Sequence, residues 1–203
     1  MEKLISIEYN TEEKRSIILT NVIKMLTARK ILDKKKLDAN IDKILKFQTD
    51  DLTYKIKSDV DEKQEFVIKF FLQKISSVSK TTGIIEFLNA HKNSPKILIV
   101  TNINPKAQKK LTTDFYHVEV FKDIELMINL IEHELIPKHE LLTEDEKKEF
   151  LKSYQCKKKN LMRMYLSDPV ARYYKMEVGD IVRIMRPSET SGYSLNYRII
   201  INK

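Results

Sequence analysis

Residues 179–201 read GDIVRIMRPSETSGYSLNYRIII, two mostly apolar segments joined by a polar loop that contains a glycine. Segments of this kind on either side of a short loop are typical of a β-hairpin. Gly179 can adopt the left-handed turn that leads into the first segment. We therefore predict strands over 181–186 and 193–201, and a small sheet at this end of the chain.

Upstream of the hairpin, three local signals predict short elements. Pro137 favours an extended segment, because its ring disfavours helix in the residue before it. Thr143 and Glu146 have the spacing of a capping box, which predicts a helix that ends near residue 154. Asp168 followed by Pro169 predicts a second helix through residue 174. We expect residues 132–203 to form a small α+β domain that ends in a β-hairpin.

Residues 1–131 predict an α/β domain with a mixed sheet. Asn10 and Glu13 form another capping-box pattern, followed by apolar residues at helical spacing. Strands are expected over 52–56, 66–72, 96–101 and 115–121. Helices are expected over 11–30, 75–88, from Pro105 onward and over 123–131, while 33–46 is a surface helix or a loop. A helix between the second and third strands predicts that these two strands are parallel.

The composition is that of a globular protein. Of 203 residues, 42% are apolar and 33% are charged, which suffices for a buried core. The single cysteine, Cys156, cannot form a disulfide within the chain and fits a reducing compartment. Because no apolar run is long enough to cross a bilayer, we expect a soluble protein without membrane contact. The net charge of +8 permits contact with nucleic acid.

Candidate catalytic and metal-binding groups are few. His133 and His139 lie among glutamates, but Pro137 breaks any helix that would align them, so packing is favoured over a metal site. Cys156 stands beside three lysines without a defined histidine partner, and packing is again favoured. The strand over 96–101 contains no carboxylate, unlike the central strands of metal-dependent nucleases. We predict no catalysis, no metal and no cofactor.

Four motifs follow one another in the last third of the chain: His133–His139, Ser167–Tyr173, Gly179–Ile184 and Arg186–Arg198. In this order and at this spacing, they resemble the assembly domain of the fifth subunit of eukaryotic-type DNA-directed RNA polymerases, called H in archaea. The resemblance covers essentially all of residues 132–203. It implies that residues 1–131 form the jaw domain of the longer eukaryotic form, a nuclease-like fold without catalytic residues.

Other residues extend or qualify this resemblance. The segment Asn104-Pro105-Lys106-Ala107 is similar to a Thr-Pro-Ser-Ala turn of the family's jaw domain. Met162 stands where the family often has proline, and Tyr193 stands where an arginine usually follows the loop glycine. A jaw rich in lysine, isoleucine and asparagine indicates an A+T-rich genome, that of a large DNA virus or of a divergent eukaryote.

The resemblance implies a non-catalytic polymerase subunit. Its C-terminal domain would dock on the largest subunit, beside neighbouring small subunits, and its jaw would lie near downstream duplex DNA without reading its sequence. The implied docking residues are Arg186, Ser188, Glu189, Thr190, Gly192, Tyr197 and Arg198. The implied DNA-proximal residues are Asn104, Lys106, Lys109 and Lys110. The motif residues expected to shape the C-terminal domain are His133, Pro137, His139, Asp168, Pro169 and Gly179.

Two further expectations concern location and the alternative functions. A cellular eukaryotic subunit would be nuclear, whereas a viral one would be found in the virion and the host cytoplasm, and neither would be secreted. The alternatives are a stand-alone basic DNA-binding protein with a degenerate nuclease fold, and a nuclease that retains metal-dependent cleavage. Without the resemblance, Glu189 would be interpreted as a solvated turn residue.

Overall fold

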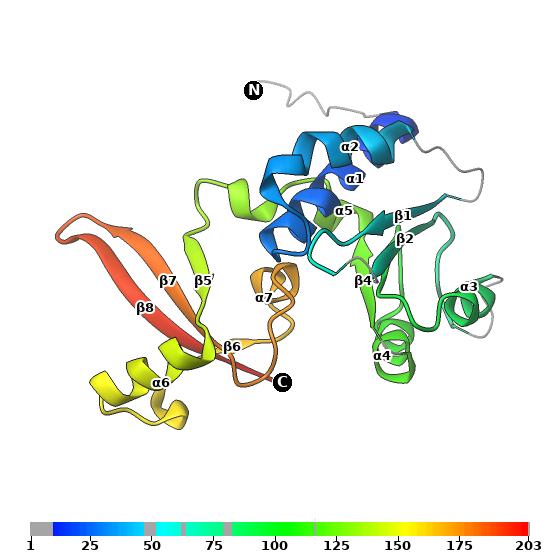
Figure 1. The fold of residues 1–203 in the computed structure, drawn as a ribbon. Helices are drawn as coiled ribbons and strands as arrows, with labels where there is room; N and C mark the ends of the chain where they lie inside the picture. The colour runs from blue at the N-terminus through cyan, green and yellow to red at the C-terminus, as the bar shows by residue number, and fades with distance from the viewer. Residues whose placement is uncertain (1–9, 47–51, 62–63, 79–82, 116, 203) are drawn as a thin grey trace, which may run out of the picture. The chain divides into compact units, whose positions relative to one another are not determined.

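The computed structural model describes residues 10–46, 52–61, 64–78, 83–115 and 117–202 (Figure 1). The chain divides into two compact units, Met1–Ile128 and Asn129–Lys203, which we call unit 1 and unit 2. Both units combine helices with a four-stranded sheet. The predicted α+β class is therefore confirmed.

Unit 1 is built on a mixed sheet in the order β1-β2-β3-β4. Its strands are β1 (Thr53–Lys57), β2 (Glu65–Phe71), β3 (Lys96–Val100) and β4 (Val118–Lys122). The β1–β2 pair is antiparallel, whereas β2–β3 and β3–β4 are parallel, which confirms the predicted parallel pair. All five residues of β3 are buried, as expected for a central strand with both faces covered.

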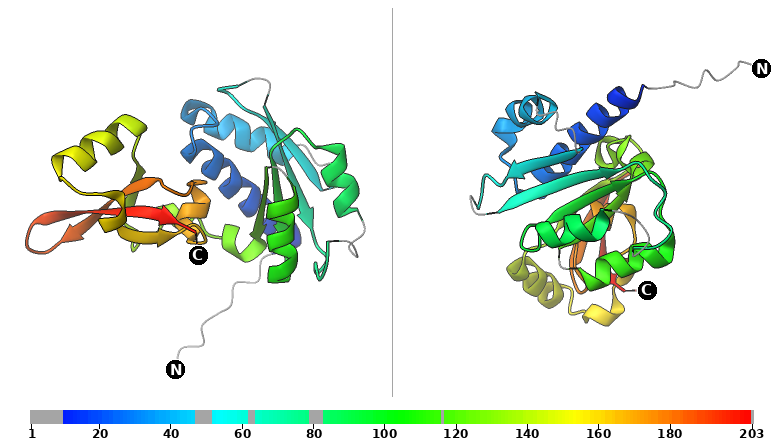
Figure 2. Two further views of the ribbon diagram at one scale, coloured as in Figure 1. Left: turned by 90° about the horizontal axis from the view of Figure 1, so that it is seen from below. Right: turned by 90° about the vertical axis from the view of Figure 1, so that its right-hand side faces the viewer.

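Helices cover both faces of this sheet, as Figures 1 and 2 show. The helices are α1 (Thr11–Ala28), α2 (Leu37–Lys46), α3 (Ile84–Ala90), α4 (Pro105–Asp114) and α5 (Asp123–Leu126), with a 3-10 turn η1 at Lys34–Lys36. Side chains of α3 and α4 pack on Val67, Leu98 and Val120, and α1 and α2 lie on the opposite face. The capping box of Asn10 and Glu13 is confirmed at the start of α1.

Several predicted boundaries in unit 1 are wrong. The helix expected over 75–88 is present only from Ile84, because Ile75 forms a parallel bridge with Ile103, and residues 79–82 of that prediction lie outside the described residues. The strand expected from residue 115 starts at Val118, since Phe115 is the C-cap of α4. The helix expected over 123–131 stops at Leu126, and the helix expected to reach residue 30 stops at Ala28.

Unit 2 contains a second sheet in the order β5-β7-β8-β6. Its strands are β5 (Lys138–Leu141), β6 (Met162–Tyr165), β7 (Ile181–Ser188) and β8 (Gly192–Ile201), and its helices are α6 (Glu144–Ser153) and α7 (Pro169–Tyr173), with 3-10 turns η2 (Leu130–Glu132) and η3 (Lys158–Asn160). The predicted hairpin is confirmed as β7 and β8, which pair in antiparallel register. Strand β6, parallel to β8, was not predicted.

The unit 2 sheet is covered on both faces. Val170 and Ala171 of α7 pack with Val182, Ile184 and Ile200 on one face. On the other face, Phe150 of α6 packs with Leu142 and Ile181. Asp168 caps α7, and the capping box of Thr143 and Glu146 begins α6, so both predicted helix starts are confirmed. In the part of the chain that the structure describes, no helix is both long and apolar enough to cross a membrane.

Candidate functional site

The β7–β8 hairpin extends beyond the strands that flank it. Strand β5 pairs with β7 only as far as Met185, and β6 pairs with β8 only from Arg198 onward. The distal end of the hairpin, Arg186–Ser188 with Gly192–Ser194, is therefore a two-stranded ribbon among the described residues (Figure 1). Isolated two-stranded ribbons are marginally stable in water. Contact with another surface would stabilise this end of the hairpin.

One face of the β7–β8 hairpin presents large apolar side chains to solvent, on the ribbon and next to it. Tyr193 lies opposite Pro187, and Leu195 lies opposite Met185, so the four residues share this face. The exposed fractions are 74% for Tyr193 and 51% for Leu195. Contiguous exposed apolar groups mark surfaces that bind partners. We call these four residues the apolar strip.

The tip of the hairpin is polar and exposed. The hydroxyls of Ser188 and Thr190 lie 3.4 Å apart, and the Tyr193 N–H donates to the Ser191 carbonyl at 2.8 Å. Gly192 has φ +73°, a left-handed conformation that other residues adopt only at a cost. Glu189 forms no hydrogen bond or ion pair within the described residues, so its carboxylate is available to a partner.

Tyr197 lies at the base of the ribbon and packs within unit 2. Its ring stacks on Phe150 with ring centroids 4.1 Å apart, and Tyr154 completes the cluster. Nearby, Arg183 donates to the Glu140 carboxylate at 2.6 Å and 3.0 Å. Hydrogen bonds from Lys138 and then Arg183 hold the pKa of Glu140 below its ordinary value. These contacts fix the base from which the ribbon projects.

The sheet face opposite the apolar strip gathers several of the motif residues. His139 pairs with Ile184. The charges of Asp168, Arg186 and Arg198 are near enough to the His139 ring to affect its pKa. The Nε atom of Arg198 is buried without a hydrogen-bond partner among the described residues. The structure thus brings together four residues that lie far apart in the sequence.

The two histidines do not converge on a metal-binding arrangement. The His139 Nδ1 atom is 2.6 Å from the Pro137 carbonyl, whereas the His133 Nδ1 atom accepts a hydrogen bond from the Leu135 N–H at 3.3 Å. Within the described ranges, no three His, Cys, Asp or Glu side chains are grouped so that they could hold a metal. Local hydrogen bonds account for both rings, and the half-buried Cys156 packs against the cluster of Leu142, Phe150 and Ile181.

His139 should make the stability of unit 2 depend on pH. Burial lowers the pKa of His139 from its ordinary value of 6.5, which outweighs the opposing hydrogen bond to Pro137 and the charge of Asp168. Because the pKa of His139 is lower in the folded state, the folded state binds this proton less readily than the unfolded state does. The contribution of neutral His139 to stability is therefore complete above pH 6.5, and it is lost as the pH falls through the folded-state pKa. In His139→Gln, this loss of stability below pH 6.5 should disappear. Urea unfolding followed by NMR signals of β7 and β8 tests this; an unchanged pH slope would contradict it.

Unit 2 also holds a buried ion pair that sequence analysis missed. Lys147 of α6 is 6% exposed, and its ammonium donates to Asp180 at 2.7 Å and to Glu144 at 2.6 Å. Burial alone lowers the pKa of Lys147, but these hydrogen bonds outweigh it and raise the pKa. Asp180 follows Gly179, whose φ of +96° confirms the predicted left-handed turn. The ion pair therefore ties the Gly179 turn to α6.

Unit 1 contributes a separate basic surface at the start of α4. Asn104 caps the helix by accepting the Lys106 N–H at 3.3 Å, and Pro105 is its first residue, as predicted. Lys106, Lys109 and Lys110 are all exposed. Their spacing of three and four residues places these side chains on one face of the helix. Lys106 lies in the first turn, near the positive end of the helix dipole, which favours an anion, and Lys109 and Lys110 extend the basic face one turn further along α4.

Comparison with known proteins extends over both units. Residues 128–200 match the family model described as RNA polymerase Rpb5, C-terminal domain. The Caenorhabditis briggsae protein named DNA-directed RNA polymerases I, II, and III subunit RPABC1 is 33% identical over 154 residues, covering 74% of this chain and 73% of that protein. The Acanthamoeba polyphaga mimivirus protein named DNA-directed RNA polymerase subunit 5 is 30% identical over 206 residues, covering 98% of each chain. The chain belongs to the Rpb5 family.

The resemblance drawn from the four motifs is thereby confirmed. The Rpb5 domain match covers nearly all of unit 2, and the mimivirus relative extends the similarity across unit 1. A Dictyostelium discoideum relative, also named subunit rpabc1, is 38% identical over 136 residues, covering 63% of this chain and 66% of that protein. The two departures from the Rpb5 pattern, Met162 and Tyr193, are 62% and 74% exposed, so the folding of unit 2 does not depend on the family's usual residues there.

Proposed function

We propose that this chain is a non-catalytic subunit of a multisubunit DNA-directed RNA polymerase. Membership of the Rpb5 family carries the proposal, since relatives from animals, an amoeba and a virus are all named as subunits of this enzyme. Residues 132–203 are the assembly domain, and residues 1–131 are the jaw. The subunit is nuclear in a cellular eukaryote, or is present in the virion and host cytoplasm if a virus encodes it.

The β7–β8 hairpin docks on the largest subunit, beside neighbouring small subunits. The apolar strip supplies buried contact area, and the exposed tip supplies polar groups. Glu189 makes charge-assisted hydrogen bonds when a partner covers it, since carboxylates accept strongly from N–H groups. Arg186, Ser188 and Thr190 lie beside it on the same ribbon. Tyr197 and Arg198 contribute to docking from the base of the hairpin.

Removal of the polar groups at the tip should weaken docking. The double variant Glu189→Ala and Thr190→Ala should reduce co-purification with the largest subunit at least tenfold, because hot-spot truncations at interfaces typically cost about 2 kcal/mol. The matched control is Glu149→Ala with Lys152→Ala, two exposed positions on α6. Unchanged recovery of the largest subunit with the tip variant would show that the tip is merely solvated.

The jaw approaches downstream duplex DNA through the start of α4. Lys106, Lys109 and Lys110 meet the phosphate backbone, and Asn104 orders the amide groups at the helix end. Contacts of this type do not read base sequence and are screened by salt. Each phosphate that is neutralised adds about 0.9 to the slope of log affinity against log salt.

Charge reversal at these lysines tests the DNA contact. In a polymerase assembled with the Lys106→Glu, Lys109→Glu, Lys110→Glu variant, retention of downstream DNA should fall at low salt, and the salt slope should become shallower by about 2–3 if each lysine neutralises one phosphate. The control variant replaces the exposed Lys157, Lys158 and Lys159 by glutamate, which changes the net charge by the same amount. Equal retention by the two variants would mean that the α4 lysines are an ordinary solvated face.

The subunit proposal itself is tested by affinity purification of the tagged chain from its native source. Stoichiometric recovery of polymerase subunits is expected. Recovery of the chain without them, together with tight duplex binding by the isolated chain, would instead support the stand-alone DNA-binding alternative. Metal-dependent cleavage by the isolated chain would support a nuclease.

A further inference from the structure

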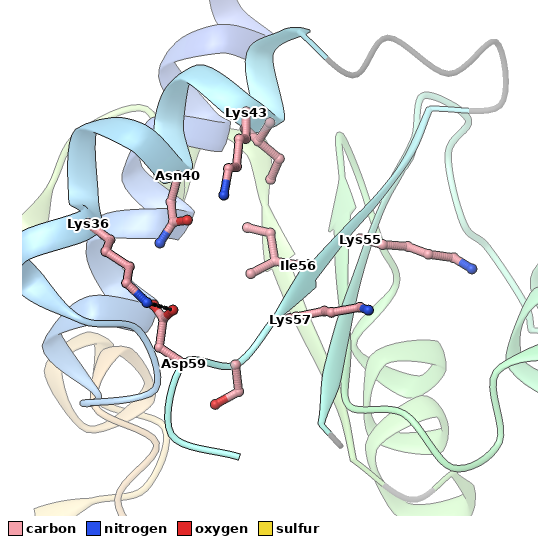
Figure 3. Close-up of a pocket in the computed structure, with 9 residues that line it drawn as sticks. Lys36, Asn40, Lys43, Lys55, Ile56, Lys57 and Asp59 are labelled. Atoms are coloured by element: carbon pink, nitrogen blue, oxygen red, sulfur yellow. Dashed lines mark hydrogen bonds and ion pairs between the residues drawn. The ribbon is translucent and has the colours of Figure 1, made fainter. Parts of the chain in front are cut away.

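A pocket of about 570 Å³ lies in unit 1 between α2 and β1 (Figure 3). Its helix-side wall is formed by Lys36, Asn40, Lys43 and Ile44, and its strand-side wall runs from Lys55 to Asp59. In Figure 3, Ile56 points toward α2, whereas the Lys55 and Lys57 side chains extend away from it. Lys55 and Lys57 therefore line the pocket with their backbone.

Strand β1 is the edge of its sheet, with β2 as its only partner among the described strands. Ser58 N–H donates to Gln64, and Leu52 C=O accepts from Phe70, so the even-numbered residues exchange hydrogen bonds with β2. Since these groups alternate along an antiparallel strand, the N–H and C=O groups of Lys55 and Lys57 point outward. The pocket thus borders a row of backbone donors and acceptors that β2 does not use.

The helix-side wall adds polar groups directed at this edge. The Asn40 Nδ2 atom is buried and has no acceptor within hydrogen-bonding distance, although Asn40 contributes slightly to the low pKa of Asp59. Asp59 is already engaged, because its carboxylate accepts from the Asp33 N–H and from Lys36 at 2.9 Å. Lys43 points into the pocket and forms no ion pair within the described residues. A buried donor without an acceptor is costly, so an incoming acceptor would be favoured here.

We propose that this edge binds an extended acidic peptide segment of a partner protein, which adds a strand to β1. The backbone of the segment pairs with Lys55 and Lys57, and one of its carboxylates faces Lys43 and Asn40. Acidic side chains on its other face lie against the Lys55 and Lys57 ammonium groups. This inference goes beyond the polymerase-subunit proposal and does not depend on it.

A peptide fits the pocket better than a free phosphate does. The outward carbonyls of Lys55 and Lys57 would repel a phosphate, whereas a peptide backbone supplies N–H groups to meet them. Lysines on an edge strand discourage pairing with most chains. The same lysines favour an acidic strand, because opposite charges across a strand pair are stabilising. The charge of the edge therefore selects among possible partners.

The test uses the full chain and a fluorescent octapeptide of two Glu-Glu-Thr-Thr repeats, which places glutamates on both faces of a strand. An octapeptide of two Lys-Lys-Thr-Thr repeats is the control probe. Fluorescence anisotropy measures binding, and NMR measures the amide shifts of Lys55 and Lys57. The acidic peptide should bind and shift both amides, and the basic peptide should not. Lys43→Glu should weaken binding about tenfold or more, whereas Lys46→Glu, an equal charge change on the same helix outside the pocket, should weaken it less.

A second variant separates strand addition from simple charge attraction. Lys55→Pro removes an outward N–H while keeping the bonds between β1 and β2, since prolines are tolerated on sheet edges. Circular dichroism and thermal unfolding confirm that the variant folds. Lys55→Gln is the matched control, because it loses the same charge but keeps the outward N–H. Lys55→Pro should bind the peptide much more weakly than Lys55→Gln does. Equal binding by these two variants, competition by inorganic phosphate alone, or absence of amide shifts at millimolar peptide would overturn the proposal.

Discussion

Asp180→Ala is expected to lower the unfolding free energy of unit 2 by about 3–5 kcal/mol. Lys147 has a side chain only 7% exposed and donates to Asp180 at 2.7 Å. Without this carboxylate, the buried Lys147 ammonium loses its more buried charge partner. Glu144 does not replace it, because the Glu144 side chain is 76% exposed and solvent screens its attraction to Lys147. Asp180 also accepts the Glu177 N–H at 2.7 Å, so the turn before β7 loosens as well. Urea unfolding read from NMR signals of β7 and β8 measures the change.

Two controls isolate the role of the buried charge. Asp180→Asn keeps an oxygen that can accept the Glu177 N–H but removes the negative charge, so it should be destabilising by less than Asp180→Ala. Asp145→Ala removes the partner of Lys148 in an ion pair whose side chains are 77% and 97% exposed, and stability should hardly change. If Asp180→Ala behaved like Asp145→Ala, the buried ion pair would contribute little to unit 2.

Glu119→Ala should lower the unfolding free energy of unit 1 by a similar amount, about 3–5 kcal/mol. The Arg29 side chain is 3% exposed, and both of its terminal nitrogens donate to Glu119, at 2.9 Å and 2.7 Å. Such paired contacts between guanidinium and carboxylate are among the stronger hydrogen bonds in proteins. The variant removes the link between the end of α1 and β4. Urea unfolding followed at β4 amides measures the loss.

The matched comparison is Glu65→Ala, on the same sheet. Glu65 pairs with Lys55 at 3.9 Å, and the two side chains are 35% and 53% exposed. An ion pair this long and this solvated should contribute under about 1 kcal/mol. Equal losses in Glu119→Ala and Glu65→Ala would mean that burial does not strengthen the Arg29 contact.

Local signals predicted the helix starts and the hairpin well. Asn10, Asn104, Thr143 and Asp168 all cap helices, since a side-chain oxygen satisfies amide groups only a few residues away. The apolar segments on either side of the Gly192 loop predicted β7 and β8, because the two strands of a hairpin are also neighbours in the sequence. The order of the motifs predicted the Rpb5 family, which the relatives confirm.

Periodicity alone failed where an apolar run serves another contact. Ile75 and Val78 have helical spacing with Ile84 and Leu88, yet Ile75 pairs with Ile103 as a short bridge. Both arrangements bury the same side chains, and spacing cannot distinguish them. The sequence signal for the apolar strip is the alternation of Tyr193, Leu195 and Tyr197 on β8, which places these side chains on one face of the strand.

The sequence alone predicted the helix caps, most strands, the hairpin and the family. Each of these depends on residue types at a few neighbouring positions. The pairing of β6 with β8, the contacts of Lys147 with Asp180 and of Arg29 with Glu119, and the pocket beside β1 required the folded chain. Such contacts join residues tens of positions apart, and many carboxylates could have served each cation. Only the packing of the elements brings one of them within reach.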